Sequence, residues 1–417
     1  MQVFKFGGAS VKDAPAIRNL SNILRLYSGE ELVVVISAMG KTTNFLERLL
    51  KAYSNQENTS SLVEELMSYH LDVLEELLPG DNEGKNRLMC LRQEMENRLA
   101  LPYSGHYDYE YDQIVSFGEL LSTTLISYYL QQVGVSNTWL NATELVITDT
   151  TYREGKVDWE QTASKICTAV PLAWKSQYVV VTQGFIGGTD AGTRVTLGRE
   201  GSDYTAAIFA YCLDASRVTI WKDVPGLLNA DPKRFPDAVK LDQLPYQEAL
   251  ELSYYGASVI HPKTLKPLQN KHIPLFVKSF FHPEDPGSMI GDCQLSTTIP
   301  SFIVKDHQTL LTIFPKDFSF VAEENLSEIF TLFAKHRVHI NMMQNSALSF
   351  SVCTGTEIER LKACVAEFQS RYKVKYNEQV TLVTIRHYTP EAIKRVIEGR
   401  TILLRQTSRT TIQYVLL

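Results

Sequence analysis

Several classes of protein are excluded by what the sequence lacks. Its six cysteines are scattered, with no CxxC pair and no histidine at metal-ligand spacing, which argues against a disulfide framework and a zinc site. No uncharged apolar run approaches the roughly 20 residues that a membrane helix needs. The first ten residues contain no apolar core of the kind found in signal peptides. We therefore expect a cytoplasmic protein with reduced thiols and no membrane contact.

The charge balance also excludes some partners. The 41 basic and 47 acidic residues give a formal charge of −6 and form no long run of one sign, so nucleic acid is not an expected partner. Any anion site must then be local. With 44% hydrophobic and 21% charged residues, the chain has a globular composition. Its 417 residues suggest two or three domains, at about 150 residues per domain.

The apolar pattern predicts one large α/β domain over residues 1–297. A strand (QVFKF), a helix over 12–28 and a buried strand (LVVVIS) open the chain. Further apolar strands at 178–182, 217–221 and 273–277 are separated by helical stretches, which include 60–100 and 113–131. Continuous apolar strands indicate a mostly parallel sheet with helices on both faces.

The pattern changes near residue 298 to two small units with ferredoxin-like order. The first covers about 308–378, and the second combines about 299–307 with 379–417. We expect the second unit to be truncated, because the sequence stops where another helix would be expected. One face of its sheet should then be uncovered unless a partner copy or the large domain covers it.

The segment KFGGAS lies between the first strand and the first helix. Gly7 and Gly8 would let backbone N–H groups approach an anion at the helix N-terminus, and Lys5 would face the same anion. A purely structural glycine turn is the alternative. The lysine favours phosphate.

The segment SAMGKTTN resembles a P-loop, but its spacing does not fit, because Val35 stands where the first glycine is required. Its hydroxyl residues Ser37, Thr42 and Thr43 can either cap the following helix or bind a carboxylate or phosphate.

Six glycines lie between Gln183 and Asp203. GFIGG and TDAG predict a β-hairpin, which is a structural use of glycine. Arg199 lies beside glycines at a helix entry, where its guanidinium can hold a carboxylate or phosphate by paired hydrogen bonds. Asp203 either belongs to the same site or only complements the helix dipole.

Seven segments, in this order, resemble the aspartate kinase family: KFGGAS, SAMGKTTN, SFGELLS, TQGFIGG, TLGREGSDYTA, DVPGLLNADP and GASVIHP. The resemblance implies the amino-acid kinase fold, a mostly parallel sheet between helices, followed by two ACT domains. It implies transfer of the γ-phosphoryl group of Mg-ATP to the β-carboxylate of L-aspartate, the first step of lysine, threonine and methionine synthesis. A carboxylate with a pKa of about 3.9 is already an ionised nucleophile at pH 7, so positioning and charge neutralisation suffice.

The resemblance also implies roles for individual residues. Lys5, Gly7, Gly8 and Asp203 would be catalytic, with Asp203 beside Lys5 or the magnesium ion as the one candidate metal contact. Glu119 would hold the substrate ammonium, although a solvated helix carboxylate is the alternative. The substrate carboxylates would be bound by Ser37, Thr43 and Arg199. The implied ATP-binding residues are Lys5, Gly8, Ser10, Lys222, Asp223, Leu228, Lys233 and Ser258.

The sequence departs from the family pattern in the nucleotide half. Lys222, Leu228, Lys233 and Ser258 replace the family's threonine, tyrosine, arginine and lysine. Altered nucleotide affinity is therefore expected.

An effector site for lysine or threonine is implied between paired ACT domains, which should also form a homodimer. Glu324 replaces a glycine there and Asn341 an aspartate, so lysine inhibition should be weak or absent. A lysine site rebuilt with Glu323 or Glu324 is the alternative. Two other functions stay open: a kinase of another small acid such as glutamate, and a catalytically weak amino-acid sensor.

Overall fold

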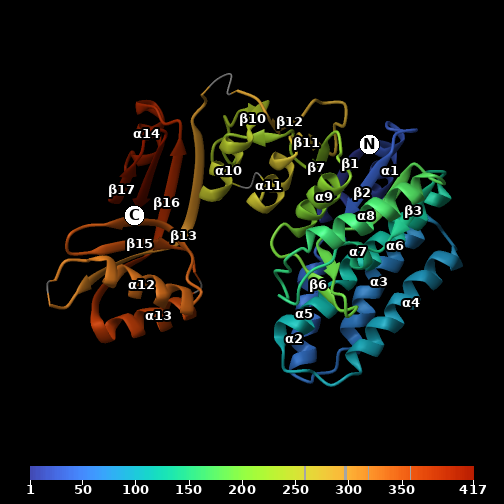
Figure 1. The fold of residues 1–417 in the computed structure, drawn as a ribbon, viewed down its shortest axis with the longest axis horizontal. Coiled ribbons are helices and arrows are strands. Elements are labelled where there is room, and N and C mark those ends of the chain that lie inside the picture. Colours follow the sequence, from blue (N-terminus) through green and yellow to red (C-terminus); the bar gives the residue numbers. More distant parts are fainter. Residues whose placement is uncertain (258–259, 295–297, 318, 357) are drawn as a thin grey trace. The chain divides into compact units, whose positions relative to one another are not determined.

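The computed structural model describes residues 1–257, 260–294, 298–317, 319–356 and 358–417 (Figure 1). The chain divides into two compact units. The first comprises Met1–Leu227, Lys240–Leu250 and Ser258–Leu295, and the second comprises Leu228–Val239, Glu251–Ala257 and Ser296–Leu417. The second unit thus includes two segments that precede residue 298.

The first unit is built on an eight-stranded sheet, which confirms the mostly parallel arrangement. Its strand order is β10 (Gln243–Pro245), β12 (Ser288–Gly291), β11 (Leu275–Ser279), β7 (Val218–Lys222), β1 (Gln2–Phe6), β2 (Leu32–Ile36), β4 (Val179–Gln183) and β3 (Asn137–Leu140). Strands β12 and β11 pair antiparallel, and the other neighbours in this sheet pair parallel.

The helices of this unit follow the predicted alternation. They are α1 (Ala14–Arg25), α2 (Thr42–Ser54), α3 (Ser60–Leu77), α4 (Asn82–Leu99), α5 (Tyr107–Val115), α6 (Phe117–Gln132), α7 (Ala142–Leu145), α8 (Trp159–Trp174), α9 (Gly201–Cys212) and α11 (Pro262–Asn270), with a 3-10 turn η1 (Gly8–Val11). The helical stretch 60–100 is two helices, and Asp81 caps the second by accepting a hydrogen bond from Gly84 N. The predicted hairpin is β5 (Ile186–Gly188) with β6 (Arg194–Thr196).

Two short strands and one helix lie in the part of the sequence where the chain passes from one unit to the other and back. The strands are β8 (Leu227–Leu228) and β9 (Lys240–Leu241), and the helix is α10 (Tyr246–Tyr255).

The side chains of strand β1 alternate between an apolar core on one face of the sheet and a charged group on the other. Phe4 and Phe6 join an apolar core with residues of α1 to α6. Because successive side chains of a strand point to opposite faces, Lys5 points away from that core. Helix α9 packs against β1 and β2, and it supplies the partner of Lys5 described below.

The second unit contains one six-stranded antiparallel sheet, in the order β14 (Ile340–Asn345), β15 (Phe350–Thr354), β13 (Ser301–Pro315), β16 (Tyr372–Arg386), β18 (Thr411–Leu416) and β17 (Ile402–Thr407). Strands β13 and β16 are each 15 residues long and pass through both predicted small units. The register of this pair shifts between Lys305 and Leu310, where one small unit gives way to the other. The sequence predicted the elements but not their union in one sheet.

Helices cover the two halves of this sheet separately. Helices α12 (Glu323–Lys335) and α13 (Ile358–Arg371) pack on the first half, and α14 (Pro390–Ile397) packs on the second. The second half was expected to have an uncovered face unless something else packs there. Its apolar residues Val383, Ile385 and Ile412 are at most 1% exposed within this chain. Part of the cover lies before residue 298, since the ring of Phe235 stacks on the ring of Phe302 in β13, with 4.8 Å between their centres.

Among the described residues, no helix combines the length and the apolar content needed to span a bilayer.

Candidate active site

A buried ion pair lies at the carboxyl end of β1. Lys5 Nζ is 2.6 Å from Asp203 Oδ1, in the first turn of α9, and the side chains are 11% and 4% exposed. The pair has the distance of an ion pair without the angular geometry of a hydrogen bond, since Asp203 Oδ1 has no hydrogen-bond partner among the residues that the structure describes. Opposite charges attract strongly in such a poorly solvated place. These two residues are 198 positions apart in the sequence, and the fold brings them together.

Glu119 lies near this pair at the start of α6. Its Oε1 accepts a hydrogen bond from Ala38 N at 3.1 Å, and Oε2 has no hydrogen-bond partner among the described residues. Burial raises the pKa of this carboxyl to about 8, opposed by the Ala38 N–H and by the charge of Lys5. The residue is 2% exposed, so the solvated-carboxylate interpretation is wrong. One oxygen of a buried carboxyl is therefore left without a partner within the described part of the chain.

Glycines allow the loops around these charges to meet. A Cβ on Gly8 would lie 2.8 Å from Ala38 O and 2.9 Å from Gly40 O, and Gly40 N donates to Gly8 O at 3.0 Å. A Cβ on Gly118 would lie 2.9 Å from that of Ala38. The segments KFGGAS and SAMGKTTN are therefore in contact, and α6 approaches the second of them. A Cβ on Gly7 would lie 3.4 Å from Lys5 Nζ, so backbone and ammonium share one small space.

The hydroxyl residues after β2 do not cap α2. The N-cap residue is Lys41, and no side chain accepts a hydrogen bond there, so the capping interpretation is wrong. Ser37 is held through its backbone, which donates to Phe6 O at 3.1 Å and accepts from Ser122 Oγ at 2.8 Å. Thr43 is half-buried in the first turn of α2.

Arg199 is exposed in the turn before α9. Within the described part of the chain, its guanidinium makes no hydrogen bond and no ion pair.

The candidate ATP residues are distributed over both units. Ser10 is buried and donates to Trp221 O at 3.4 Å, Lys222 ends β7, and Asp223 follows it as an exposed residue. Leu228 and Lys233 belong to the second unit, where Lys233 is exposed. Ser258 lies outside the described residues.

The two effector candidates lie in the second unit. Glu324 is exposed in the first turn of α12. Both polar atoms of the Asn341 side chain have partners, because its Oδ1 accepts from Lys305 Nζ and its Nδ2 donates to Gln308 Oε1, both at 2.8 Å. No group of three or more histidine, cysteine, aspartate or glutamate residues is arranged for metal binding in the ranges described.

One buried polar residue beside the site was missed. Gln183 ends β4, accepts from Ala142 N at 2.7 Å and donates to Thr123 Oγ1 at 2.8 Å. The signal was a polar residue directly after the apolar strand at 178–182.

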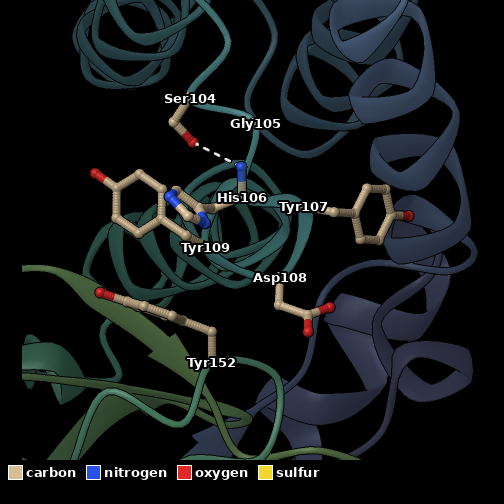
Figure 2. A pocket seen from close by; sticks show the side chains of 7 residues that line it. All are labelled: Ser104, Gly105, His106, Tyr107, Asp108, Tyr109 and Tyr152. Atoms are coloured by element: carbon tan, nitrogen blue, oxygen red, sulfur yellow. Dashed lines mark hydrogen bonds between the residues drawn. The ribbon is translucent and has the colours of Figure 1, made fainter.

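A separate surface pocket lies at the start of α5 (Figure 2). It is lined by Ser104, Gly105, His106, Tyr107, Asp108, Tyr109 and Tyr152, and none of the predicted site residues lines it.

Comparison with known proteins agrees with this geometry. The model of the amino acid kinase family matches residues 1–279. The lysine-sensitive aspartokinase 3 of Escherichia coli K12 is 32% identical over 359 residues, which cover 85% of this chain and 78% of that protein. A bifunctional aspartokinase/homoserine dehydrogenase 2 of Arabidopsis thaliana is 29% identical over 384 residues, and the chain spans only 42% of that longer relative.

Among solved structures, E. coli aspartokinase III in complex with aspartate and ADP has a TM-score of 0.84 and 26% identity, covering all of this chain and 96% of that one. The chain therefore belongs to the amino acid kinase family and, within it, to the aspartokinases.

The raised pKa of Glu119 predicts how stability depends on pH. Between the unfolded value of 4.5 and the folded value of about 8, the folded state keeps a proton that the unfolded state has lost. The stability of the ligand-free protein should therefore fall as pH rises through this range. Glu119→Gln removes this term, so its melting temperature should rise relative to wild type from pH 5 to pH 8, by at least about 2 °C. A difference between the two proteins that stays constant across this range would contradict the assignment.

Proposed function

We propose that this chain is an ATP-dependent aspartate kinase. It would transfer the γ-phosphoryl group of Mg-ATP to the β-carboxylate of L-aspartate and release 4-phospho-L-aspartate, the entry compound for lysine, threonine and methionine synthesis. The observation that carries the proposal is the buried Glu119 Oε2, which has no hydrogen-bond partner in the described part of the chain and lies beside the Lys5–Asp203 ion pair. Similarity to an aspartokinase solved with aspartate and ADP supports it.

The proposed chemistry uses the residues for positioning and charge. Glu119 loses its proton and accepts the substrate ammonium, which supplies the missing partner of Oε2. Arg199 clamps a substrate carboxylate, aided by Ser37 and Thr43. Lys5 neutralises charge on the transferring phosphoryl group, while the backbone N–H groups at Gly7 and Gly8 approach its oxygens.

Magnesium is part of this proposal. One carboxylate together with substrate phosphates is a donor set that Mg²⁺ accepts, and Asp203 is the carboxylate at hand. When bound, Mg²⁺ would neutralise charge on the ATP phosphates.

The proposed domains are a catalytic domain over 1–297 and a tandem ACT region over 298–417. We further propose a cytoplasmic homodimer joined through the ACT region. Strand β14 supports this arrangement, because it ends the sheet order and Met343 on it is 48% exposed.

The test of the function is a coupled assay with ATP, Mg²⁺, L-aspartate and hydroxylamine, which traps the acyl phosphate as a hydroxamate. Wild type should form aspartyl hydroxamate, and Lys5→Ala should lower kcat by about 100-fold with little change in the aspartate KM, because the charge of Lys5 acts mainly as the phosphoryl group departs. Lys12→Ala is the matched control, since Lys12 is an exposed lysine seven residues after Lys5.

Two other results of this assay, and one calorimetric result, are informative. No hydroxamate above the Lys5→Ala level would refute the kinase proposal. Hydroxamate from glutamate in preference to aspartate would favour a kinase of another small acid. An amino-acid sensor would bind an amino acid in calorimetry but show little affinity for an ATP analogue.

Regulation by lysine should be weak or absent. Both polar atoms of the Asn341 side chain already have partners within the chain, so a ligand ammonium would have to share Oδ1 with the positively charged Lys305. Titration of the kinase reaction with lysine, threonine and methionine measures this. We expect less than half inhibition by lysine at about 1 mM, and inhibition well below that concentration would indicate a formed site.

A further inference from the structure

Helix α5 carries a buried carboxylate that none of the motifs uses. Asp112 is 0% exposed. It accepts a hydrogen bond from Thr196 Oγ1 at 2.7 Å and another from Arg153 N at 2.9 Å. Thr196 ends β6, and Arg153 lies in the loop between α7 and α8. One side chain thus ties α5 to two segments that are distant in the sequence.

Both tethers lead to the turn that carries Arg199. Thr196 lies three residues before it, and its carbonyl oxygen also accepts from Gly155 N at 3.0 Å. Gly198 has a φ of +79°, and a Cβ there would lie 3.1 Å from Arg153 O. Gly201 N donates to Gly198 O at 3.0 Å and closes the turn. The turn is therefore fastened through Thr196 and rests against the backbone of Arg153.

Arg153 is itself held in an unusual conformation. Its φ is +69°, which a non-glycine residue keeps only where its surroundings fix it. Its guanidinium pairs with Asp108 at 3.2 Å and lies 4.5 Å from the centre of the Tyr111 ring. Figure 2 shows the neighbouring Tyr152 close to Tyr109, and their ring centres are 5.2 Å apart. Helix α5 therefore holds this loop in two ways. Other residues of the helix contact the side chains of the loop, and Asp112 binds its backbone.

We propose that Asp112 is a positioning residue for aspartate recognition, which fixes the turn carrying Arg199 without touching the substrate. The inference rests on the proposed function, in which Arg199 clamps a carboxylate. Arg199 has no partner of its own among the described residues, so its placement depends on the backbone that carries it. A turn that is not ordered in advance must be ordered on binding, and this costs affinity. Asp112 should therefore affect the aspartate KM and not the ATP KM.

The chain offers a matched control on the same helix. Glu110 is also 0% exposed, and its carboxylate accepts from Ser104 N at 3.0 Å and pairs with Arg98, away from both tethers. In the hydroxamate assay, Asp112→Ala should raise the aspartate KM by about tenfold or more and change the ATP KM less than about twofold. Arg199→Ala should also raise the aspartate KM, and Glu110→Gln should change neither the aspartate KM nor the ATP KM.

Rescue separates hydrogen bonding from charge. In Asp112→Asn the carboxamide oxygen can still accept from Arg153 N, and its NH₂ group can donate to Thr196 Oγ1. This variant should recover most of the aspartate affinity. Thr196→Val removes the hydrogen bond from Thr196 Oγ1 to Asp112 and should raise the aspartate KM by an intermediate amount. This variant serves as the test if Asp112→Ala does not fold.

A second measurement does not depend on activity. Trypsin cleaves after exposed arginines, so cleavage after Arg199, relative to the exposed Arg409, reports how firmly the turn is held. This ratio should rise several-fold in Asp112→Ala and stay unchanged in Glu110→Gln. If wild type forms no hydroxamate, the proposed function fails, while the cleavage ratio still tests the tether.

The inference is overturned if a folded Asp112→Ala leaves the aspartate KM and the cleavage ratio unchanged. It is also overturned if both KM values rise equally, or if Glu110→Gln reproduces the effects.

Discussion

The ion pair between Lys5 and Asp203 is the constraint on which the site depends. A lysine ammonium that points away from the apolar core of β1 into a poorly solvated space needs an opposite charge, because an unpaired buried charge costs several kcal/mol. Asp203 meets this need only if α9 begins beside the end of β1. The close packing of Gly8 on Ala38 and Gly40 then encloses the charges between loops. The site thus follows from the packing of α9 and the glycine loops at the carboxyl end of β1.

The carboxyl group of Glu119 lacks one hydrogen-bond partner within the described chain when no ligand is bound. One of its oxygens accepts a hydrogen bond from the chain, and the other has no hydrogen-bond partner in the ranges that the structure describes. Burial keeps the group protonated at neutral pH. An arriving ammonium would favour the ionised form by supplying the missing opposite charge. Under the proposed function, substrate recognition and ionisation of Glu119 are therefore one event, and the adjacent Lys5 remains available for the phosphoryl group.

Local patterns in the sequence predicted most of the elements, since buried strands and amphipathic helices have clear periods. The glycine loops were also predictable as places of close approach. The partner of Lys5 could not be derived from spacing: Asp203 was a candidate from its position at a helix entry, but its place beside Lys5 was implied only by a family resemblance. Asp112 had no pattern at all, because a single buried polar residue looks like any other until its partners are known, and the position of Gln183 directly after an apolar strand did not identify its partners. The long strands β13 and β16 were missed as continuous strands because their middle residues, near the register shift, are polar.

The most direct test of this account is proton release when L-aspartate binds. Calorimetry at pH 7 in two buffers of different ionisation enthalpy measures the number of protons exchanged. With a free-state pKa of about 8, Glu119 carries its proton at pH 7 and must lose it to accept the ammonium. The account predicts release of close to one proton per bound aspartate, and none in Glu119→Gln. Binding to wild type without proton release would contradict it.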